Sequence, residues 1–364
     1  MSSREPVLIR VFKAPHCATT LTQADWSLLV RQARSAHVLG HALDTITDAC
    51  GLAVLPEKAA AALKSERQLA QHRIRSTIWE AKELARILGS IGVQPVLLKG
   101  GAYLAEELPF SKYRFFGDID ILVPHAKIGI TEKTLMTQGW ISTTRDTYDQ
   151  RYYRTWMHEV PPMAHIQRGT HLDLHHNITP LTSRYKVDAK LLLEAARPAA
   201  AHPELKVLAF EDMILHAAAH LFSDGESESA FRGLTDLKAL IEADRISHEV
   251  LILRAKQLEL TLPLALAARH VAKVFASGTA QQLSDALHAD NGAASRIALL
   301  DPIYDRVFLG FHPSCGTRGL GPARLAVNLR GHLLRMPIRL LLPHLLRKAL
   351  RSNKEGAETP RPLK

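Results

Sequence analysis

Two aspartates, Asp118 and Asp120, are the residues of this chain whose type and spacing point most directly to chemistry. They lie in GDIDILVP at 117–124, where acidic and apolar residues alternate as in a strand with one polar face. Alternate residues of a strand point the same way, with Cα atoms about 6–7 Å apart. Two carboxylates at that spacing can bridge a pair of Mg²⁺ ions, which can hold a triphosphate and activate an attacking oxygen. The alternative is a plain exposed face of an edge strand.

A glycine pair precedes this strand. The segment VQPVLLKGG at 93–101 predicts a buried strand that ends in a tight turn at Gly100 and Gly101, followed by a short helix. The first free N–H groups of a helix can bind phosphate, and glycine lets a phosphate approach the backbone closely. The turn is therefore a candidate phosphate site beside the two aspartates.

A third carboxylate is expected on a neighbouring strand. Asp173 fits, because THLDLHHNI at 170–178 predicts a strand in which Leu172 and Leu174 face the core and Asp173 faces the other way. A lone acid on a strand is also compatible with an ordinary solvated position.

Taken together, these motifs resemble the DNA polymerase beta-like nucleotidyltransferase superfamily, and more narrowly an uncharacterised bacterial nucleotidyltransferase family. The pattern of that family is LKG, an Arg, DIDxLV and xDLHxxI, and the segments FEDMILHAAAHL and LTDLKALI resemble its C-terminal helices. In this chain the motif residues are Leu98-Lys99-Gly100, Arg114, Asp118 to Val123, and Leu172-Asp173-Leu174-His175. The resemblance covers roughly residues 20–245.

The resemblance implies Mg²⁺ (or Mn²⁺) as cofactor and an NTP as substrate. It implies that Asp118, Asp120 and Asp173 hold the metal, with Asp173 also helping to deprotonate the acceptor. Gly100 and Gly101 would receive the β- and γ-phosphates, and Lys99 and Arg114 would balance their charge.

Each of these assignments has a structural alternative. Lys99 can be the polar end of a strand, and Arg114 a loop arginine paired with Glu106 or Glu107. The chain also has Gly-Gly where the superfamily usually has Gly-Ser, and seventeen positions separate Gly101 from Asp118.

The elements that must position these residues predict an α+β fold. Residues 21–90 show helical spacing with Thr22 or Asp25 as a cap, and 187 onward turns helical again. Between them, the order of strand, helix, strand, helix and strands predicts an α/β-type core between the helical regions, with several short strands between 151 and 178. The resemblance implies that this core is the small mixed sheet of a nucleotidyltransferase.

Four regions are expected on this basis. They are an N-terminal helical region at 1–92, the nucleotidyltransferase-like core at 93–180, a C-terminal helical region at 181–300, and a basic Leu/Arg-rich tail at 301–364.

The net charge of +10 is concentrated at one end of the 364-residue chain. From Thr317 to Lys364 there are eleven Lys/Arg and two acids, a net charge of +9, which leaves +1 for the other 316 residues. The near-neutral body makes a nucleic-acid substrate the less favoured choice. The segment 317–364 predicts contact with an anionic membrane surface or a protein partner, although Pro337 and Pro343 interrupt any long helix.

Several other classes of protein are excluded. The three cysteines lie far apart without a CxxC, which argues against a disulfide framework and a zinc knuckle. Neither GxxxxGK[ST] nor GxSxG occurs, and no apolar stretch is long enough to span a membrane. The expected location is the cytoplasm, with possible attachment to the inner face of the membrane.

Two pairs of histidines could either bind a metal ion or make structural contacts. Strand alternation puts His171 and His175 on the face of Asp173, where either could support the site, but a neutral, hydrogen-bonded histidine is the more common outcome. His216 and His220 have the i, i+4 spacing of a zinc site, but the glutamate of HExxH is missing, which favours a polar packing contact.

The sequence thus favours an enzyme that transfers a nucleoside monophosphate from an NTP to a small molecule, a sugar or a protein. The alternative is a catalytically weak or inactive protein of the same fold that binds or regulates.

Overall fold

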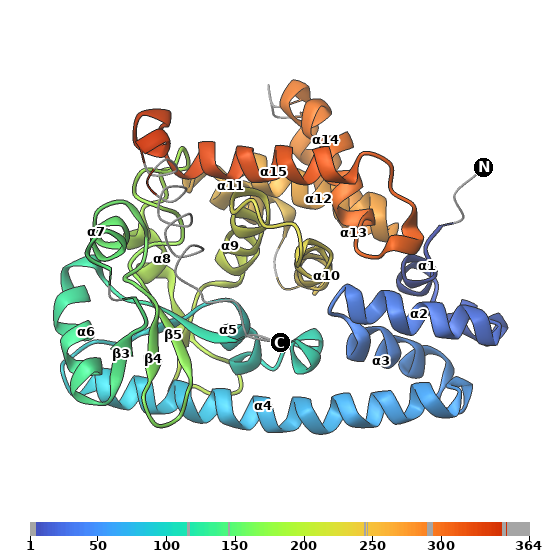
Figure 1. Cartoon of the computed structure of the whole chain (residues 1–364), viewed down its shortest axis with the longest axis horizontal. Coiled ribbons are helices and arrows are strands. Elements are labelled where there is room, and N and C mark those ends of the chain that lie inside the picture. The colour runs from blue at the N-terminus through green and yellow to red at the C-terminus, as the bar shows by residue number, and fades with distance from the viewer. Residues whose placement is uncertain are drawn as a thin grey trace, which may run out of the picture.

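The computed structural model describes residues 5–114, 117–144, 146–243, 245, 247–289, 294–343 and 347. One long helix, α4 (Glu57–Gly89), runs along the base of the molecule in Figure 1, with the sheet above one half of it and a layer of helices above the sheet. The α+β class predicted from the sequence is confirmed: the strands form one mixed sheet, and helices precede and follow it along the chain.

The N-terminal helices follow the caps read from the sequence. In α2 (Gln23–Ser35), the Thr22 side chain accepts a hydrogen bond from the Asp25 N–H, and the Asp25 carboxylate accepts one from the Thr22 N–H. This reciprocal capping box is worth about 1 kcal/mol to the helix. Both predicted cap residues are therefore used.

Helix α4 links the N-terminal helices to the sheet. It begins after Pro56 and is about 50 Å long, because each residue adds about 1.5 Å. It packs against α3 (Leu39–Cys50) on one half and against α5 (Lys99–Ala105) and α6 (Ile128–Thr137) on the other. The sheet is thereby attached to a rigid base.

The sheet contains seven strands in the order β3-β4-β5-β2-β1-β7-β6. The pairs β2–β5 and β1–β7 are parallel and the other pairs are antiparallel. The strands are β1 (Val96–Leu97), β2 (Asp118–Leu122), β3 (Trp140–Ser142), β4 (Met163–His165), β5 (His171–His175), β6 (Arg197–Pro198) and β7 (Lys206–Val207).

The pairing of β2 with β5 sets the geometry of the site. Asp120 is directly opposite Asp173, and the neighbouring Ile119 and Leu172 are also paired. Ile119 and Leu172 are buried, as expected for the core face of each strand. The two aspartates therefore share the opposite face of adjacent central strands.

Two local expectations differ from the structure. Residues 151–156, where short strands were expected, belong to helix α7 (Thr147–Trp156). Strands β6 and β7 follow residue 187, where only helices were expected. Both strands are only two residues long, and β6, at the edge of the sheet, contains Pro198, so neither shows the alternating pattern that marks a strand.

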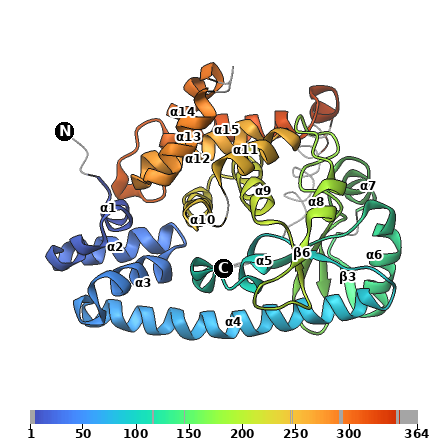
Figure 2. The same ribbon diagram turned by 180° about the vertical axis from the view of Figure 1, so that it is seen from behind.

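Helices α9 to α15 form a layer on the side of the molecule away from α4, and Figure 2 shows the same layers from behind. These helices are α9 (Phe210–Ser223), α10 (Ala230–Ile241), α11 (His248–Gln257), α12 (Thr261–Phe275), α13 (Gly278–Ala289), α14 (Ala294–Leu309) and α15 (Leu320–Arg335). Two further helices are short: α1 (Val7–Lys13) and α8 (Ala189–Ala195). Within the described residues, no helix combines the length and hydropathy needed to cross a membrane.

Candidate active site

A cavity of about 540 Å³ opens over the polar face of β2 and β5. Its wall includes six acidic residues, Asp118, Asp120, Glu159, Asp173, Asp224 and Glu226. Four basic side chains line it as well, Lys99, Arg114, Arg232 and Arg335. The cavity thus collects charged groups from the sheet, from α10 and from the end of α15.

Asp120 is the most buried of the three predicted metal ligands, at 5% exposure. Its Oδ1 accepts a hydrogen bond from Lys99 Nζ at 3.2 Å and from His175 Nε2 at 3.0 Å. Burial alone would raise the pKa of Asp120, but the Lys99 charge and the His175 hydrogen bond outweigh burial and hold this pKa well below its usual range. Asp120 is therefore an anion at neutral pH.

Asp173 faces a different environment on the neighbouring strand. Burial and the nearby carboxylates of Glu159 and Asp120 raise the pKa of Asp173 to about 7. Ligand atoms of Asp120, Asp173 and His175 all lie within 4.8 Å of one another, close enough to hold one cation. The two carboxylates supply the oxygen ligands that Mg²⁺ and Mn²⁺ prefer, whereas the Nε2 of His175 is engaged with Asp120 Oδ1.

Asp118 lies at the first position of β2, partly exposed, and lines the same cavity. It faces His171 across the strand pair, whereas Asp120 faces Asp173. The structure thus brings Asp118, Asp120 and Asp173 to one wall, with the last two closest to a shared cation position.

Lys99 is positioned by the turn after β1. The Leu98 N–H donates to the Asp120 carbonyl at 3.0 Å, which holds the start of α5 against β2. Lys99 has the left-handed φ of 43°, the conformation that usually favours glycine. The first helical hydrogen bond is donated by Ala102 to Leu98.

Gly100 and Gly101 are buried in α5 and do not line the cavity. A Cβ on Gly101 would meet only the Leu97 side chain, at an ordinary 3.6 Å. Close approach of a ligand to these glycines is therefore not required by the geometry, and their role in phosphate binding stays a prediction.

Arg114 lines the cavity and donates from Nε to Asp236 Oδ2 at 2.6 Å. Its guanidinium lies 5.4 Å from the centre of the Tyr103 ring. The suggested pairing of Arg114 with Glu106 or Glu107 is wrong for Glu106, whose buried carboxylate is taken by Arg197 and Arg245.

Glu159 was not singled out in the sequence, because MHEVPP carries no periodic pattern. Its Oε2 lies 3.4 Å from His175 Nδ1, and burial raises the pKa of Glu159. The segment is held along β5, since the Val160 N–H donates to the Leu174 carbonyl at 3.0 Å. His175 therefore lies between Asp120 on one side and Glu159 on the other.

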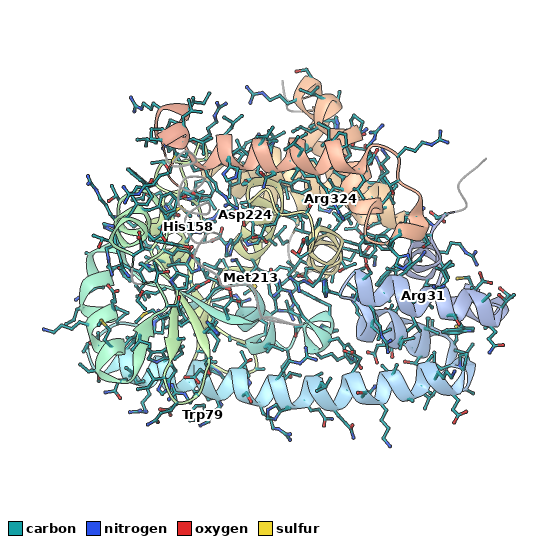
Figure 3. The ribbon with its side chains drawn as sticks, viewed as in Figure 1. Arg31, Trp79, His158, Met213, Asp224 and Arg324 are labelled. Atoms are coloured by element: carbon teal, nitrogen blue, oxygen red, sulfur yellow. The ribbon has the colours of Figure 1, made fainter. Side chains whose placement is uncertain are left out.

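A polar loop after α9 supplies another part of the wall. Asp224 Oδ2 lies 2.8 Å from His220 Nε2, and Asp224 Oδ1 lies 3.2 Å from Arg335 Nη2. Burial opposes the charge of Asp224, but His220 and Arg335 hold its pKa well below the usual range. Figure 3 shows Asp224 and His158 between the sheet and α15.

The second histidine pair behaves as a packing contact. His220 pairs with Asp224. The Asp212 carboxylate instead accepts hydrogen bonds from Nε and Nη2 of Arg254, both at 2.7 Å. His216 is buried, and burial lowers its pKa well below the usual value. Neither histidine belongs to a metal-ligand cluster within the described residues.

Arg335 changes the interpretation of the basic segment. The sequence suggested a separate tail, but Arg335 is the last residue of α15 and lines the cavity. Arg330 also turns inward and donates to the Phe222 carbonyl. Part of the basic charge therefore serves the body of the molecule, while residues 344–346 and 348–364 lie outside the described residues.

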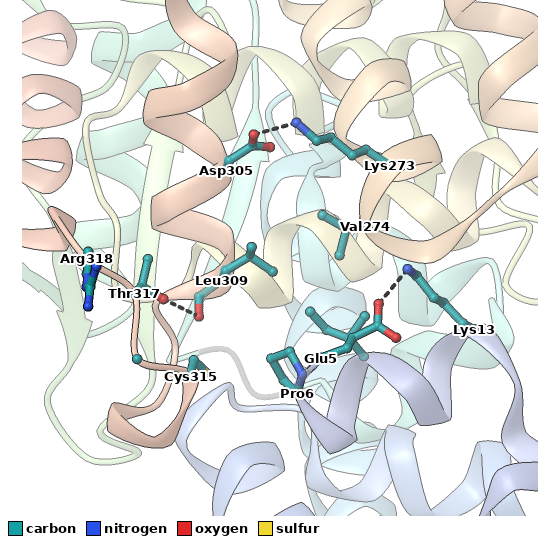
Figure 4. Close-up of a pocket in the computed structure, with 12 residues that line it drawn as sticks. Glu5, Pro6, Lys13, Lys273, Val274, Asp305, Leu309, Cys315, Thr317 and Arg318 are labelled. Carbon is teal, nitrogen blue, oxygen red and sulfur yellow. Dashed lines mark hydrogen bonds and ion pairs between the residues drawn. The ribbon is translucent and has the colours of Figure 1, made fainter. Parts of the chain in front are cut away.

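A larger cavity of about 750 Å³ lies elsewhere, between α1, α12, α14 and residues 315–318 (Figure 4). Four of its charged side chains are paired with one another: Lys13 donates to Glu5 at 2.6 Å, and Lys273 pairs with Asp305. None of the predicted catalytic residues lines it. The three predicted metal ligands line the smaller cavity instead.

The comparisons with known proteins agree with the geometry. A family described as uncharacterised nucleotidyltransferase matches residues 22–276, more than two thirds of the chain. Neither the curated proteins nor the solved structures contain a significant match. The matched range includes the whole sheet and every predicted site residue but ends before Arg335. The chain therefore belongs to this family of uncharacterised nucleotidyltransferases.

Proposed function

We propose that the chain is a Mg²⁺-dependent enzyme that transfers a nucleoside monophosphate from an NTP to a small-molecule, sugar or protein acceptor. The observation that carries the proposal is the pairing of Asp120 with Asp173 on parallel strands, with Asp118 on the same wall of a 540 Å³ cavity. Family membership supports transferase chemistry, and the acidic cluster supports a divalent metal.

Asp118, Asp120 and Asp173 would hold the ion, with His175 as a further donor or as a support for Asp120. When bound, the metal would neutralise the phosphates and polarise the reacting phosphorus. Mn²⁺ is an acceptable substitute, because carboxylate oxygens suit Mn²⁺ as well as Mg²⁺.

The phosphates would lie against the basic part of the wall. Lys99 and Arg114 keep their predicted roles, and Arg232 joins them because it lines the same cavity in the first turn of α10. The free N–H groups of Gly100 and Gly101 remain our candidates for the β- and γ-phosphates.

The transfer step would follow from this arrangement. An acceptor hydroxyl oxygen forms a bond to the α-phosphorus, and the bond from that phosphorus to the oxygen bridging the β-phosphate breaks. Pyrophosphate leaves with the electron pair, and the proton of the hydroxyl passes to the Asp173 carboxylate.

The test is the variant Asp118→Asn/Asp120→Asn, with transfer of labelled nucleotide from each NTP to a cell extract as readout. We expect transfer to fall about 100-fold or more, since even the outer partners of metal ligands are worth 10–100-fold. The control is Asp48→Asn/Asp285→Asn, two exposed positions away from the cavity. Transfer that survives in the first variant would refute the proposal.

The second candidate is a binding protein that retains the fold without turnover. Two observations favour it: Lys99 already neutralises Asp120, and Gly100 and Gly101 do not line the cavity. A shift of the melting temperature by Mg²⁺·NTP without pyrophosphate release would select this alternative. Ligand at 100 times Kd adds about 2.7 kcal/mol to the free energy of unfolding.

A further inference from the structure

The outer face of α15 is apolar and exposed. Leu325, Leu329 and Leu333 lie four residues apart on this helix and are 59%, 51% and 37% exposed. Four-residue spacing puts them in one stripe along the helix. Figure 1 shows α15 running across the side of the molecule away from α4, with α14 projecting beyond one end of it.

The inner face of α15 is already satisfied. Ala323, Val327 and Gly331 are buried, and they lie two residues before the respective leucines, on the opposite side of the helix. This inner face packs on α9 and α14. The fold therefore does not require the three exposed leucines on the outer face.

The apolar surface continues beyond the end of α15. Residues 338–343 are again helical after Pro337, and Ile338 and Leu342 are 57% and 56% exposed. A run of five large apolar side chains on one short stretch is more than the scattered exposure that soluble surfaces show. We call these five side chains the leucine stripe.

The charge around the leucine stripe has one sign. No Asp or Glu occurs between Asp305 and Glu355. Arg318, Arg324 and Arg339 are exposed beside or between the apolar positions. An acid-free helix with an apolar stripe and flanking arginines matches an anionic lipid surface, where leucines enter the acyl boundary and arginines meet the head groups.

We propose that the leucine stripe and its arginines bind the chain to the surface of an anionic membrane, with α15 lying in the plane of the interface. The surface is independent of NTP turnover. Arg335, at the end of the same helix, lines the cavity, so the candidate active site would lie close to the membrane.

The experiment is co-sedimentation of the full chain with vesicles of phosphatidylcholine containing 30% phosphatidylglycerol, beside vesicles of phosphatidylcholine alone. We expect binding to the anionic vesicles at low salt, at least tenfold weaker binding to the neutral ones, and loss of binding as salt rises. Equal, salt-insensitive binding to both, or no binding to the anionic vesicles, would overturn the proposal.

The deciding variant is Leu325→Gln/Leu329→Gln/Leu333→Gln, which should keep its fold because all three side chains are exposed. We expect its affinity for anionic vesicles to fall at least tenfold. The matched control is Leu52→Gln/Leu69→Gln/Ile141→Gln, which removes three comparably exposed side chains elsewhere and should bind normally.

Two further outcomes separate this proposal from its neighbours. If the leucine variant binds vesicles as well as the wild type, or if it abolishes a concentration-dependent dimer, the stripe serves another purpose and the proposal fails. The Asp118→Asn/Asp120→Asn variant should bind vesicles normally, so the membrane proposal can stand or fall without the proposed enzymatic function.

Discussion

Asp120 is the residue on which the charges of the cavity converge. Lys99 and His175 both donate to its Oδ1, and its partner across the sheet is Asp173. Without a metal, the ammonium of Lys99 supplies the positive charge that this buried carboxylate needs. The same ammonium repels a cation that approaches Asp120, so Lys99 and a metal ion compete for one group.

Lys99→Met tests this competition. We expect the variant to bind free Mn²⁺ about tenfold more tightly, because a positive charge 3.2 Å from a ligand oxygen has been removed. Its affinity for the nucleotide should fall, since one phosphate partner is lost. Metal titration by electron paramagnetic resonance measures the first effect, and Lys82→Met, at an exposed ion pair, is the control.

Residue types in the sequence were enough to find the three aspartates, because alternation on a strand fixes which way each points. They were not enough to find Glu159 or Asp224. Those two acids lie in irregular segments, and their positions depend on long-range contacts with β5 and with Arg335. Such contacts leave no periodic trace in the chain.

At the scale of elements, Glu106 fastens α5 to the far edge of the sheet. Its side chain is fully buried and accepts hydrogen bonds from Arg197 at 2.9 and 3.0 Å, from Arg245 at 2.8 Å and from the Ala200 N–H at 2.8 Å. Burial opposes the charge, but these donors lower the pKa of Glu106. Glu106 caps the C-terminal end of α5, the helix that begins at Lys99.

Glu106→Ala should lower the free energy of unfolding by about 3–5 kcal/mol, the usual effect of leaving buried ionic partners unpaired. Chemical denaturation measures the change. Glu107→Ala, the exposed neighbour, should stay within about 0.5 kcal/mol of the wild type. Equal effects of the two substitutions would contradict the anchoring role.

Helix α3 carries a histidine that makes stability depend on pH. Burial and the charge of Lys238 lower the pKa of His41 from 6.5 to about 4. The unfolded chain therefore binds more protons between these values, so stability is complete above pH 6.5 and falls as the pH drops toward 4.

His41→Gln should remove part of this dependence. Between pH 7 and pH 4.5 we expect the wild type to lose about 1–2 kcal/mol more than the variant, a discounted value because the ring is half-buried. Urea unfolding at the two pH values gives the comparison. Parallel losses in both proteins would show that His41 does not titrate as proposed.

Some elements could be predicted from local sequence signals, and others could not. The capping box of α2 and the strand at 118–122 follow from local signals of two to four residues. Strands β6 and β7 do not, because two-residue strands are formed by what the neighbouring strand offers and not by their own pattern. The helix α7 replaced expected strands for a similar reason: YDQRYYRTW has no strict alternation.

At the scale of the whole molecule, the distribution of charge has two roles. The body was expected to be near neutral with a separate basic tail, and the described part of that tail is instead a helix packed on the body. Arg335 and Arg330 face inward, whereas Arg318 and Arg339 face outward beside the leucine stripe. One helix thus links the wall of the candidate active site to a surface suited to anionic lipid.

The central claim is that Asp120 and Asp173 together hold the metal on which the nucleotide binds. It is tested most directly by Mn²⁺ titration, followed by electron paramagnetic resonance, with NTP analogues that carry a methylene group between the α- and β-phosphates. The wild type should bind Mn²⁺ with at least one analogue, and Asp120→Asn/Asp173→Asn should bind it at least tenfold more weakly. Equal binding by the two proteins would contradict the account.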